Sequence, residues 1–264
     1  VSPYISTYSE GMSGSCSPKD LETMLQLVYL YFTAPRADQE AFASNMERTK
    51  AMLKNMELNP MITLSDTLNK VMYNNHPLTV RMKAEDYDKV DYAKAMEMYK
   101  DRFADPNNFT FTFVGNIDVK TFRPLVEQYL ASLKKNKRSE DWKNIGLAVN
   151  DDNYVTHYRK EMQDPKTSVY MIYNGDMEYN LYNDTYMDVL SDVLDIVYTK
   201  SIREEQGGTY GVGVMGEINK RPESDFRFLI AFDTNEEVYA TLMDIAKAGL
   251  KDIAENGPRQ EDLS

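Results

Sequence analysis

Segments with helical periodicity alternate with segments of strand periodicity along the chain, and this alternation most constrains its fold. Apolar residues recur every three or four positions in residues 21–32 and again in about 184–206, which predicts two amphipathic helices. Polar and apolar residues alternate in residues 167–174 and 226–232, which is the pattern of strands. Because such helices and strands must bury their apolar faces against each other, the pattern predicts an α+β fold with helices packed on antiparallel-rich sheets.

Further helix starts and strand patterns extend this alternation. Asp38 opens one predicted helix and Asn59-Pro60 opens the next, because a side-chain oxygen can cap the first turn and Pro fits its first position. Extended structure is expected over residues 4–15. The other predicted helices lie near residues 90–103, 118–130 and 238–250, and the other predicted strands near 109–114, 153–162 and 209–218.

A charged stretch of low periodicity, residues 134–143, separates two sets of these segments. The length of 264 residues suits one large domain or two modest ones. We therefore expect two related α/β sandwich domains, at residues 1–135 and 151–264, with a linker at 136–150. Both domains are expected to be truncated, because the chain does not begin with an initiator Met and a helical pattern starts close to its end.

The net charge of −12 argues against nucleic acid as a partner, because phosphate binding needs clustered Lys and Arg. The one basic run, residues 134–138, is interpreted as a solvated helix end or linker. No apolar run approaches the roughly 20 residues that cross a bilayer, so no transmembrane segment is expected. The first residues show no signal-peptide pattern, and the cellular location stays open. The single cysteine, Cys16, is expected to pack as a small residue at a strand end.

Zinc hydrolysis needs about three protein ligands and a base, often with two His on one helix face. The chain has only two histidines, His76 and His157, and neither lies in an H-x-x-x-H or H-x-x-E-H pattern. Both are expected to be structural or to lie on the surface. The sequence therefore predicts no metal site, no bound cofactor and no catalytic residues within this chain. A G-x-G-x-x-G pattern at residues 211–216 lies inside a predicted strand, where it does not bind dinucleotides.

The segment that stands out joins a helix end to a strand. Arg203 lies in the last predicted helical turn, Gly207-Gly208 breaks the helix, and Tyr210 opens the next strand. Arg offers a rigid fork of donors and Tyr a neutral hydroxyl, so the pair could hold peptide carbonyls or a developing oxyanion. From the residues alone, the simpler interpretation is favoured, namely a favourable charge at a helix end and an ordinary strand aromatic.

In order and spacing, several segments resemble zinc metallopeptidases of the pitrilysin/insulinase type, in the C-terminal half that lacks the inverted zinc motif. The resemblance covers essentially the whole chain. The main motif runs from Arg203 to Tyr210 and resembles the family's R-x-x-x-x-x-x-Y element. The supporting segments are Tyr99 to Phe103 with Asn108 to Asp118, His76-Pro77 with Glu85-Asp86, and Asn256 to Pro258 with residues 261–263.

The resemblance implies the substrate-binding C-terminal half of a zinc-dependent endopeptidase that hydrolyses peptides. Arg203 and Tyr210 would hold the substrate backbone, and the small residues Thr209, Gly211 and Gly213 would let that backbone approach. Zinc and its ligands would belong to an N-terminal half or partner subunit outside this chain, which alone would be inactive. The alternative in the same superfamily is a non-catalytic subunit or structural protein. An inverted zinc motif upstream would distinguish the two, whereas an unrelated α/β binding domain requires a different fold.

Overall fold

The computed structural model describes residues 1–264 apart from 137–139, 154, 208, 210 and 264. The chain divides into two compact units, one of residues 1–70 and 75–145 and the other of residues 71–74 and 146–264. Helices occur with small antiparallel sheets, so the expected α+β fold class is confirmed. The expected domain limits and the linker at 136–150 stay predictions.

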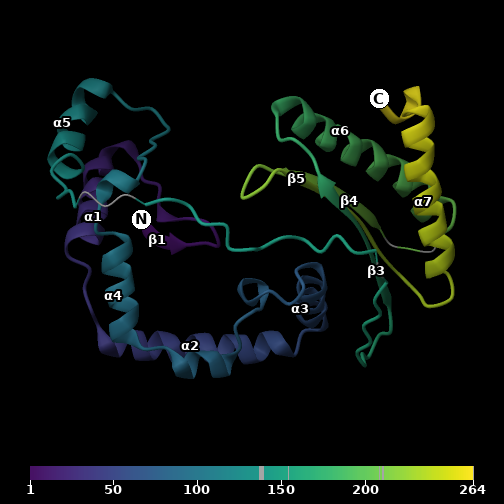
Figure 1. Cartoon of the computed structure of the whole chain (residues 1–264), viewed down its shortest axis with the longest axis horizontal. Helices are drawn as coiled ribbons and strands as arrows, with labels where there is room; N and C mark the ends of the chain where they lie inside the picture. Colours follow the sequence, from purple (N-terminus) through teal and green to yellow (C-terminus); the bar gives the residue numbers. More distant parts are fainter. Residues whose placement is uncertain (137–139, 154, 208, 210, 264) are drawn as a thin grey trace. The chain divides into compact units, whose positions relative to one another are not determined.

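The sheet of the second unit has three antiparallel strands in the order β3-β5-β4 (Figure 1). They are β3 (Thr167–Asp176), β4 (Val212–Asn219) and β5 (Asp225–Thr234). In the central strand β5, Phe228, Ile230 and Phe232 are buried and the residues between them are less so. Met171 of β3 and Val214 of β4 lie opposite Ile230 on either side. Because side chains alternate between faces along a strand, one face of this sheet is continuously apolar.

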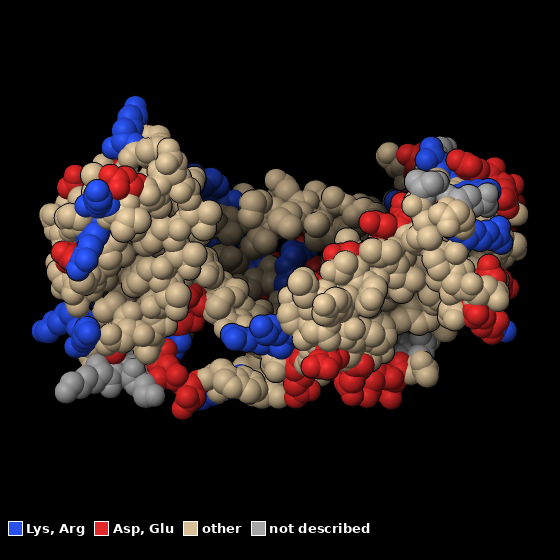
Figure 2. Space-filling view, turned by 90° about the horizontal axis from the view of Figure 1, so that it is seen from above, with Lys and Arg blue, Asp and Glu red and all other residues tan. Residues whose placement is uncertain are grey.

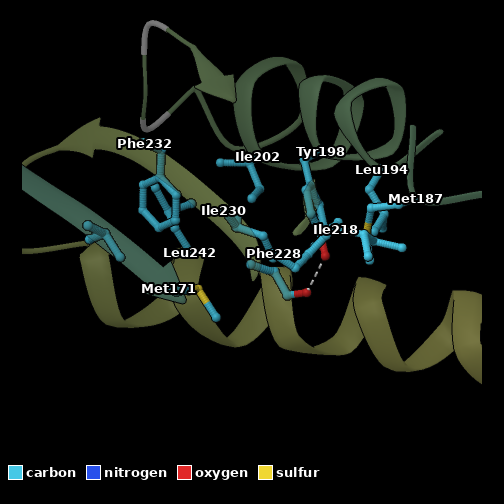
Figure 3. Packing of buried hydrophobic residues seen from close by; sticks show 12 residues of the cluster. Met171, Met187, Leu194, Tyr198, Ile202, Ile218, Phe228, Ile230, Phe232 and Leu242 are labelled. Atoms are coloured by element: carbon cyan, nitrogen blue, oxygen red, sulfur yellow. Dashed lines mark hydrogen bonds between the residues drawn. The ribbon is translucent and has the colours of Figure 1, made fainter. Parts of the chain in front are cut away.

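Two helices cover that apolar face, α6 (Leu181–Tyr198) and α7 (Tyr239–Asn256). Figure 3 shows side chains of both helices meeting those of the strands in one cluster. Leu194, Ile230 and Ala246 are completely buried there. The full cluster is Val169, Met171, Met187, Leu194, Tyr198, Ile202, Ile218, Phe228, Ile230, Phe232, Leu242 and Ala246.

The first unit is mostly helical and holds a single two-stranded hairpin among its described residues. Three leucines, Leu25, Leu130 and Leu133, form its buried cluster. The elements are β1 (Ser2–Ile5), β2 (Glu10–Ser13), α1 (Leu21–Thr33), α2 (Gln39–Glu57), α3 (Pro60–Met72, whose last two residues group with the second unit), α4 (Tyr92–Arg102) and α5 (Val119–Tyr129). Short 3₁₀ turns lie at Pro18–Asp20, Pro77–Thr79, Ala84–Lys89 and Pro106–Asn108 here and at Gln260–Leu263 in the second unit.

The predicted helix starts are confirmed by their capping bonds. The Asp38 side chain accepts a hydrogen bond from the Ala41 N–H at the start of α2, at 2.9 Å. The Asn59 side chain accepts one from the Met61 N–H before α3, also at 2.9 Å. A side-chain oxygen thus satisfies a backbone donor that has no partner within the helix. In the part of the chain that the structure describes, no helix is long and apolar enough to span a membrane.

The strand predicted over residues 109–114 is wrong, because this segment pairs with no strand among the described residues. Its aromatic residues are held by rings of helices instead. Phe109 packs on Phe32 of α1 with ring centroids 5.1 Å apart, and Phe113 packs on Phe122 of α5 at 4.9 Å. An alternating pattern predicts one apolar face of an extended segment, and here that face is only partly buried and has no backbone ladder among the described residues.

The strand predicted over residues 153–162 is wrong for the residues of that range that the structure describes. The Val155 side chain is 78% exposed, so the apolar positions of the pattern find no surface to bury them. Cys16 is also exposed and does not pack as expected at the strand end. Alternation therefore overestimated the strand content in both units.

Candidate functional site

The candidate site lies where α6 ends, and there the helix changes its hydrogen-bond register. Residues Thr199–Glu204 form a π-helical turn directly after Tyr198. The Glu205 N–H donates to the Lys200 carbonyl at 3.0 Å, five residues back rather than four. The predicted helix over about 184–206 is therefore confirmed in its course, but its last turn is wider than an α-helical turn. Such turns are rare in proteins, and those that occur often lie at functional sites.

A glycine ends this turn. Gly207 has φ of 60°, in the left-handed region that favours glycine. Its N–H donates to the Arg203 carbonyl at 3.1 Å, which is the bond of a left-handed helix cap. Beyond it, the Thr209 hydroxyl donates to the Gly211 carbonyl at 2.8 Å. The backbone on either side of the candidate residues is thus held by specific hydrogen bonds.

The side chain of Arg203 is exposed and makes no hydrogen bond or ion pair with the residues that the structure describes. Two other arginines of the same unit are paired, Arg227 with Glu217 at 2.5 Å and Arg159 with Glu236 at 3.0 Å. Acidic side chains gather in several places on the visible face of this unit, at the right of Figure 2, as the net charge of −12 implies. An unpaired guanidinium on an acidic protein is available to a ligand.

Tyr210, the second predicted site residue, lies outside the described residues, as does Gly208. Whether its hydroxyl faces the same side as Arg203 therefore stays a prediction. The helix end that carries Arg203 and the strand β4 that follows are both described, and only a few residues separate them. No sequence signal predicted the π turn, because its residues continue the helical pattern.

The first strand after the site leaves space on one face. No atom lies within 4 Å of where a Cβ would stand at Gly211 or Gly213. At Gly216, in contrast, a Cβ would stand 2.4 Å from the Met187 sulfur, so this glycine is required by packing. The G-x-G-x-x-G pattern thus runs into strand β4, as expected. Packing requires a glycine at 216, whereas no packing contact with the described residues requires one at 211 or 213.

The free edge of β4 is capped by a side chain. Asp195 of α6 accepts a hydrogen bond from the Val214 N–H at 3.3 Å. This N–H is directed at Asp195 of the helix and not at β5. An added strand would need the same N–H. The edge of β4 is therefore partly closed to a ligand backbone at Val214.

Neither histidine lies in a metal site. The His76 ring contacts the Ile145 carbonyl at 3.2 Å through Nε2 and accepts from the Leu78 N–H through Nδ1, so it fixes a turn, and His157 is exposed. Among the described residues, no group of three or more His, Cys, Asp or Glu side chains could hold a metal ion. The described part of the chain therefore offers no zinc-binding group.

A family model described as the peptidase M16 inactive domain matches residues 89–264. The chain is 27% identical to a zinc protease PQQL-like protein of Arabidopsis thaliana over 262 residues, which cover 93% of this chain and 27% of that protein. It is 20% identical to a probable zinc protease PqqL of Haemophilus influenzae, over 80% of this chain and 22% of that protein. The chain thus spans about a quarter of the length of these relatives.

Solved structures show the same fold. The periplasmic protease PqqL of Escherichia coli superposes with a TM-score of 0.79 at 21% identity, over 93% of this chain and 27% of that one. A mutant of the ferredoxin protease FusC, in complex with Arabidopsis ferredoxin, superposes with a TM-score of 0.70 at 14% identity, over 93% of this chain and 26% of that one. The first half of the E. coli protease also matches, with a TM-score of 0.65 at 14% identity, over 94% of this chain and 53% of that structure.

Proposed function

This chain belongs to the peptidase M16 family, as part of its inactive C-terminal domain, and we propose that it is the substrate-binding part of a zinc-dependent endopeptidase. Its relatives are named zinc proteases, which implies zinc in the parent enzyme. We assign the zinc and its ligands to the part of the protein outside residues 1–264. The isolated chain then binds peptide without hydrolysing it.

The observation that carries this proposal is the exposed Arg203 side chain at the end of a structured turn, which pairs with no residue in the described part of the chain. Its own carbonyl is fixed by the Gly207 cap, while its side chain is exposed. The acidic surroundings would favour an ion pair, and the described residues supply none. A cation held in this way is suited to an acceptor that arrives from outside, such as the carbonyl groups of a peptide.

The chemistry follows from the donors of the two proposed site residues. The guanidinium of Arg203 presents N–H groups in a fixed plane, and the hydroxyl of Tyr210 is a neutral donor. Both can donate to a substrate carbonyl and, more strongly, to the negative charge that develops on its oxygen during attack. Donors of this kind bind the transition state better than the ground state, so their loss lowers kcat more than it raises KM.

The test is peptide hydrolysis by the full-length protein that contains this chain, with an internally quenched peptide selected from a random library. Arg203→Ala is expected to lower kcat/KM by about 100-fold, and Tyr210→Phe by about 10-fold to 100-fold, as for the loss of other oxyanion donors. Zinc content, measured by elemental analysis, should stay equal to that of the wild type, because neither residue is assigned as a ligand.

Arg159→Ala is the matched control, because Arg159 is also an exposed arginine of the second unit. Its kinetics should equal those of the wild type. Unchanged kinetics in both Arg203→Ala and Tyr210→Phe would remove the assigned role. A full-length wild type that contains no zinc and cleaves no peptide of the library would favour the non-catalytic subunit instead.

A further inference from the structure

The π turn at Thr199–Glu204 has a structural cost that must be offset elsewhere. Its i→i+5 bonding widens the helix and loosens its packing, so π turns persist only where the surroundings hold them. The turn here begins directly after the buried end of α6 and includes Arg203. Its residues differ in burial: Ile202 lies in the core, whereas Arg203 and Glu204 are exposed.

A buried hydrogen bond fixes the core side. Tyr198 is completely buried, and its hydroxyl donates to the Ala246 carbonyl of α7 at 2.7 Å. Figure 3 shows this bond as the dashed line between the two helices. Burial raises the pKa of the Tyr198 hydroxyl well above its usual value, so the group stays protonated and continues to donate. A buried donor and acceptor that satisfy each other are costly to separate.

The neighbouring residues fit this bond closely. On α7, a Cβ at Gly249 would stand 2.7 Å from Cε1 of the Tyr198 ring, so only glycine leaves room for the ring in this position. Inside the turn, Ile202 is completely buried in the same cluster. Tyr198 and Ile202 thus anchor both ends of the widened turn in the core, and Arg203 follows the second anchor immediately.

We propose that the π turn, clamped by the Tyr198–Ala246 hydrogen bond, sets the direction in which Arg203 meets the substrate, which makes Tyr198 a positioning residue. This inference rests on the substrate-binding role proposed for Arg203. Removal of the extra residue from the turn would restore an α-helical course and rotate the following residues by about 100° around the helix axis. The Arg203 side chain would then project from a different side of the helix, although the residue itself is unchanged.

The first test is Tyr198→Phe in the full-length protein, assayed with the same quenched peptide. The substitution removes only the hydroxyl, and kcat is expected to fall by about tenfold with little change in KM. Tyr173→Phe is the matched control. Its ring packs against the same core, near Tyr198, and its hydroxyl makes no hydrogen bond with the described residues, so its kinetics should equal those of the wild type.

The second test is a deletion of Lys200, an exposed residue of the turn, which should convert the π turn into an α-helical turn. We expect kcat to fall at least as far as in Tyr198→Phe, with the circular dichroism spectrum of the protein unchanged. If the deletion variant does not fold, Gly249→Ala replaces it, because the new methyl group displaces the Tyr198 ring while the chain length stays the same.

A double-mutant cycle separates positioning from general damage. If Tyr198 acts through Arg203, then Tyr198→Phe has no further effect on kcat once Arg203 is alanine. Additive losses, or wild-type kinetics in Tyr198→Phe while Arg203→Ala is impaired, would overturn this inference and leave the proposed function intact. Wild-type kinetics in both Arg203→Ala and Tyr210→Phe would instead remove the role on which this inference rests.

Discussion

The two units bury their apolar residues in different ways. The second unit joins one face of a three-stranded sheet to two helices in a single cluster, whereas the first unit gathers three leucines and several aromatic rings between helices. In the second unit, a strand pattern in the sequence became a hydrogen-bonded ladder. In the first unit, the pattern of residues 109–114 became an extended segment without one. The comparison shows that burial of one face is not sufficient to make a strand, because the backbone also needs a partner.

The largest expected effect breaks the larger core. Ile230 lies in the central strand β5 and is completely buried. Ile230→Ala should lower the free energy of unfolding by about 4 kcal/mol, since it removes buried methyl groups and leaves a cavity among strands on both sides. Hydrogen exchange read by mass spectrometry should show faster exchange in peptides from residues 146–264. Equal acceleration throughout residues 1–145 would contradict two separate cores.

A matched change in the first unit should have a somewhat smaller effect. Leu25 of α1 is also completely buried, but it packs in a smaller cluster that can relax around a cavity. Leu25→Ala is expected to cost about 3 kcal/mol, and faster exchange should appear in peptides from residues 1–70 and 75–145. A loss larger than that of Ile230→Ala in urea unfolding would reverse the comparison of the two cores.

Two glycines of the same region should respond with opposite sign. A methyl group at Gly216 would meet Met187 and Ser191 of α6, so Gly216→Ala should destabilise by about 1–2 kcal/mol as these side chains move. Gly213 has open space, so Gly213→Ala should be neutral or stabilise by about 0.5 kcal/mol through the unfolded state. Midpoints of urea unfolding measure both. Destabilisation at Gly213 would mean that its backbone conformation needs glycine.

The smallest predicted effect depends on pH. Burial alone would raise the pKa of the Asp233 carboxyl, but hydrogen bonds from Lys166 and Ser168 outweigh burial and hold the pKa below its usual range. A lowered folded-state pKa stabilises the protein above the unfolded-state value of about 3.9, and the gain disappears as pH falls through the folded-state value. Asp233→Asn should cost less than about 1 kcal/mol at pH 7, because the pair with Lys166 is partly exposed and screened. The difference from the wild type should shrink as pH falls below the unfolded-state value, and a difference that stays constant from pH 7 into the acid range would refute the assignment.

Helices were predicted well from the sequence because their signals are local. Asp38 and Asn59 cap helices as expected, and the apolar stripe of α6 predicted the helix that covers the sheet. The strands at 167–174 and 226–232 were also predicted, and their pairing as β3 and β5 confirms them. In each of these cases the residues that form the pattern also make the contacts.

The parts that escaped prediction depend on residues distant in sequence. Residues 109–114 and 153–162 carry strand patterns, but no neighbouring strand pairs with them among the described residues. The π turn that contains Arg203 follows Tyr198, whose ring and hydroxyl are held by Gly249 and Ala246 of α7, more than 40 residues further along the chain. The candidate residue Arg203 was proposed through its motif, whereas the conformation of the turn that holds it depends on packing that no local pattern records.

The hydrogen bond from Val214 to Asp195 has a consequence for self-association. A sheet can grow into a filament only if both of its outer strands accept new neighbours, since each added chain must offer an edge to the next. A strand added beside β4 would have to displace the Asp195 carboxylate from the Val214 N–H. We therefore expect Asp195 to disfavour pairing at this edge and, with it, growth of the sheet in both directions.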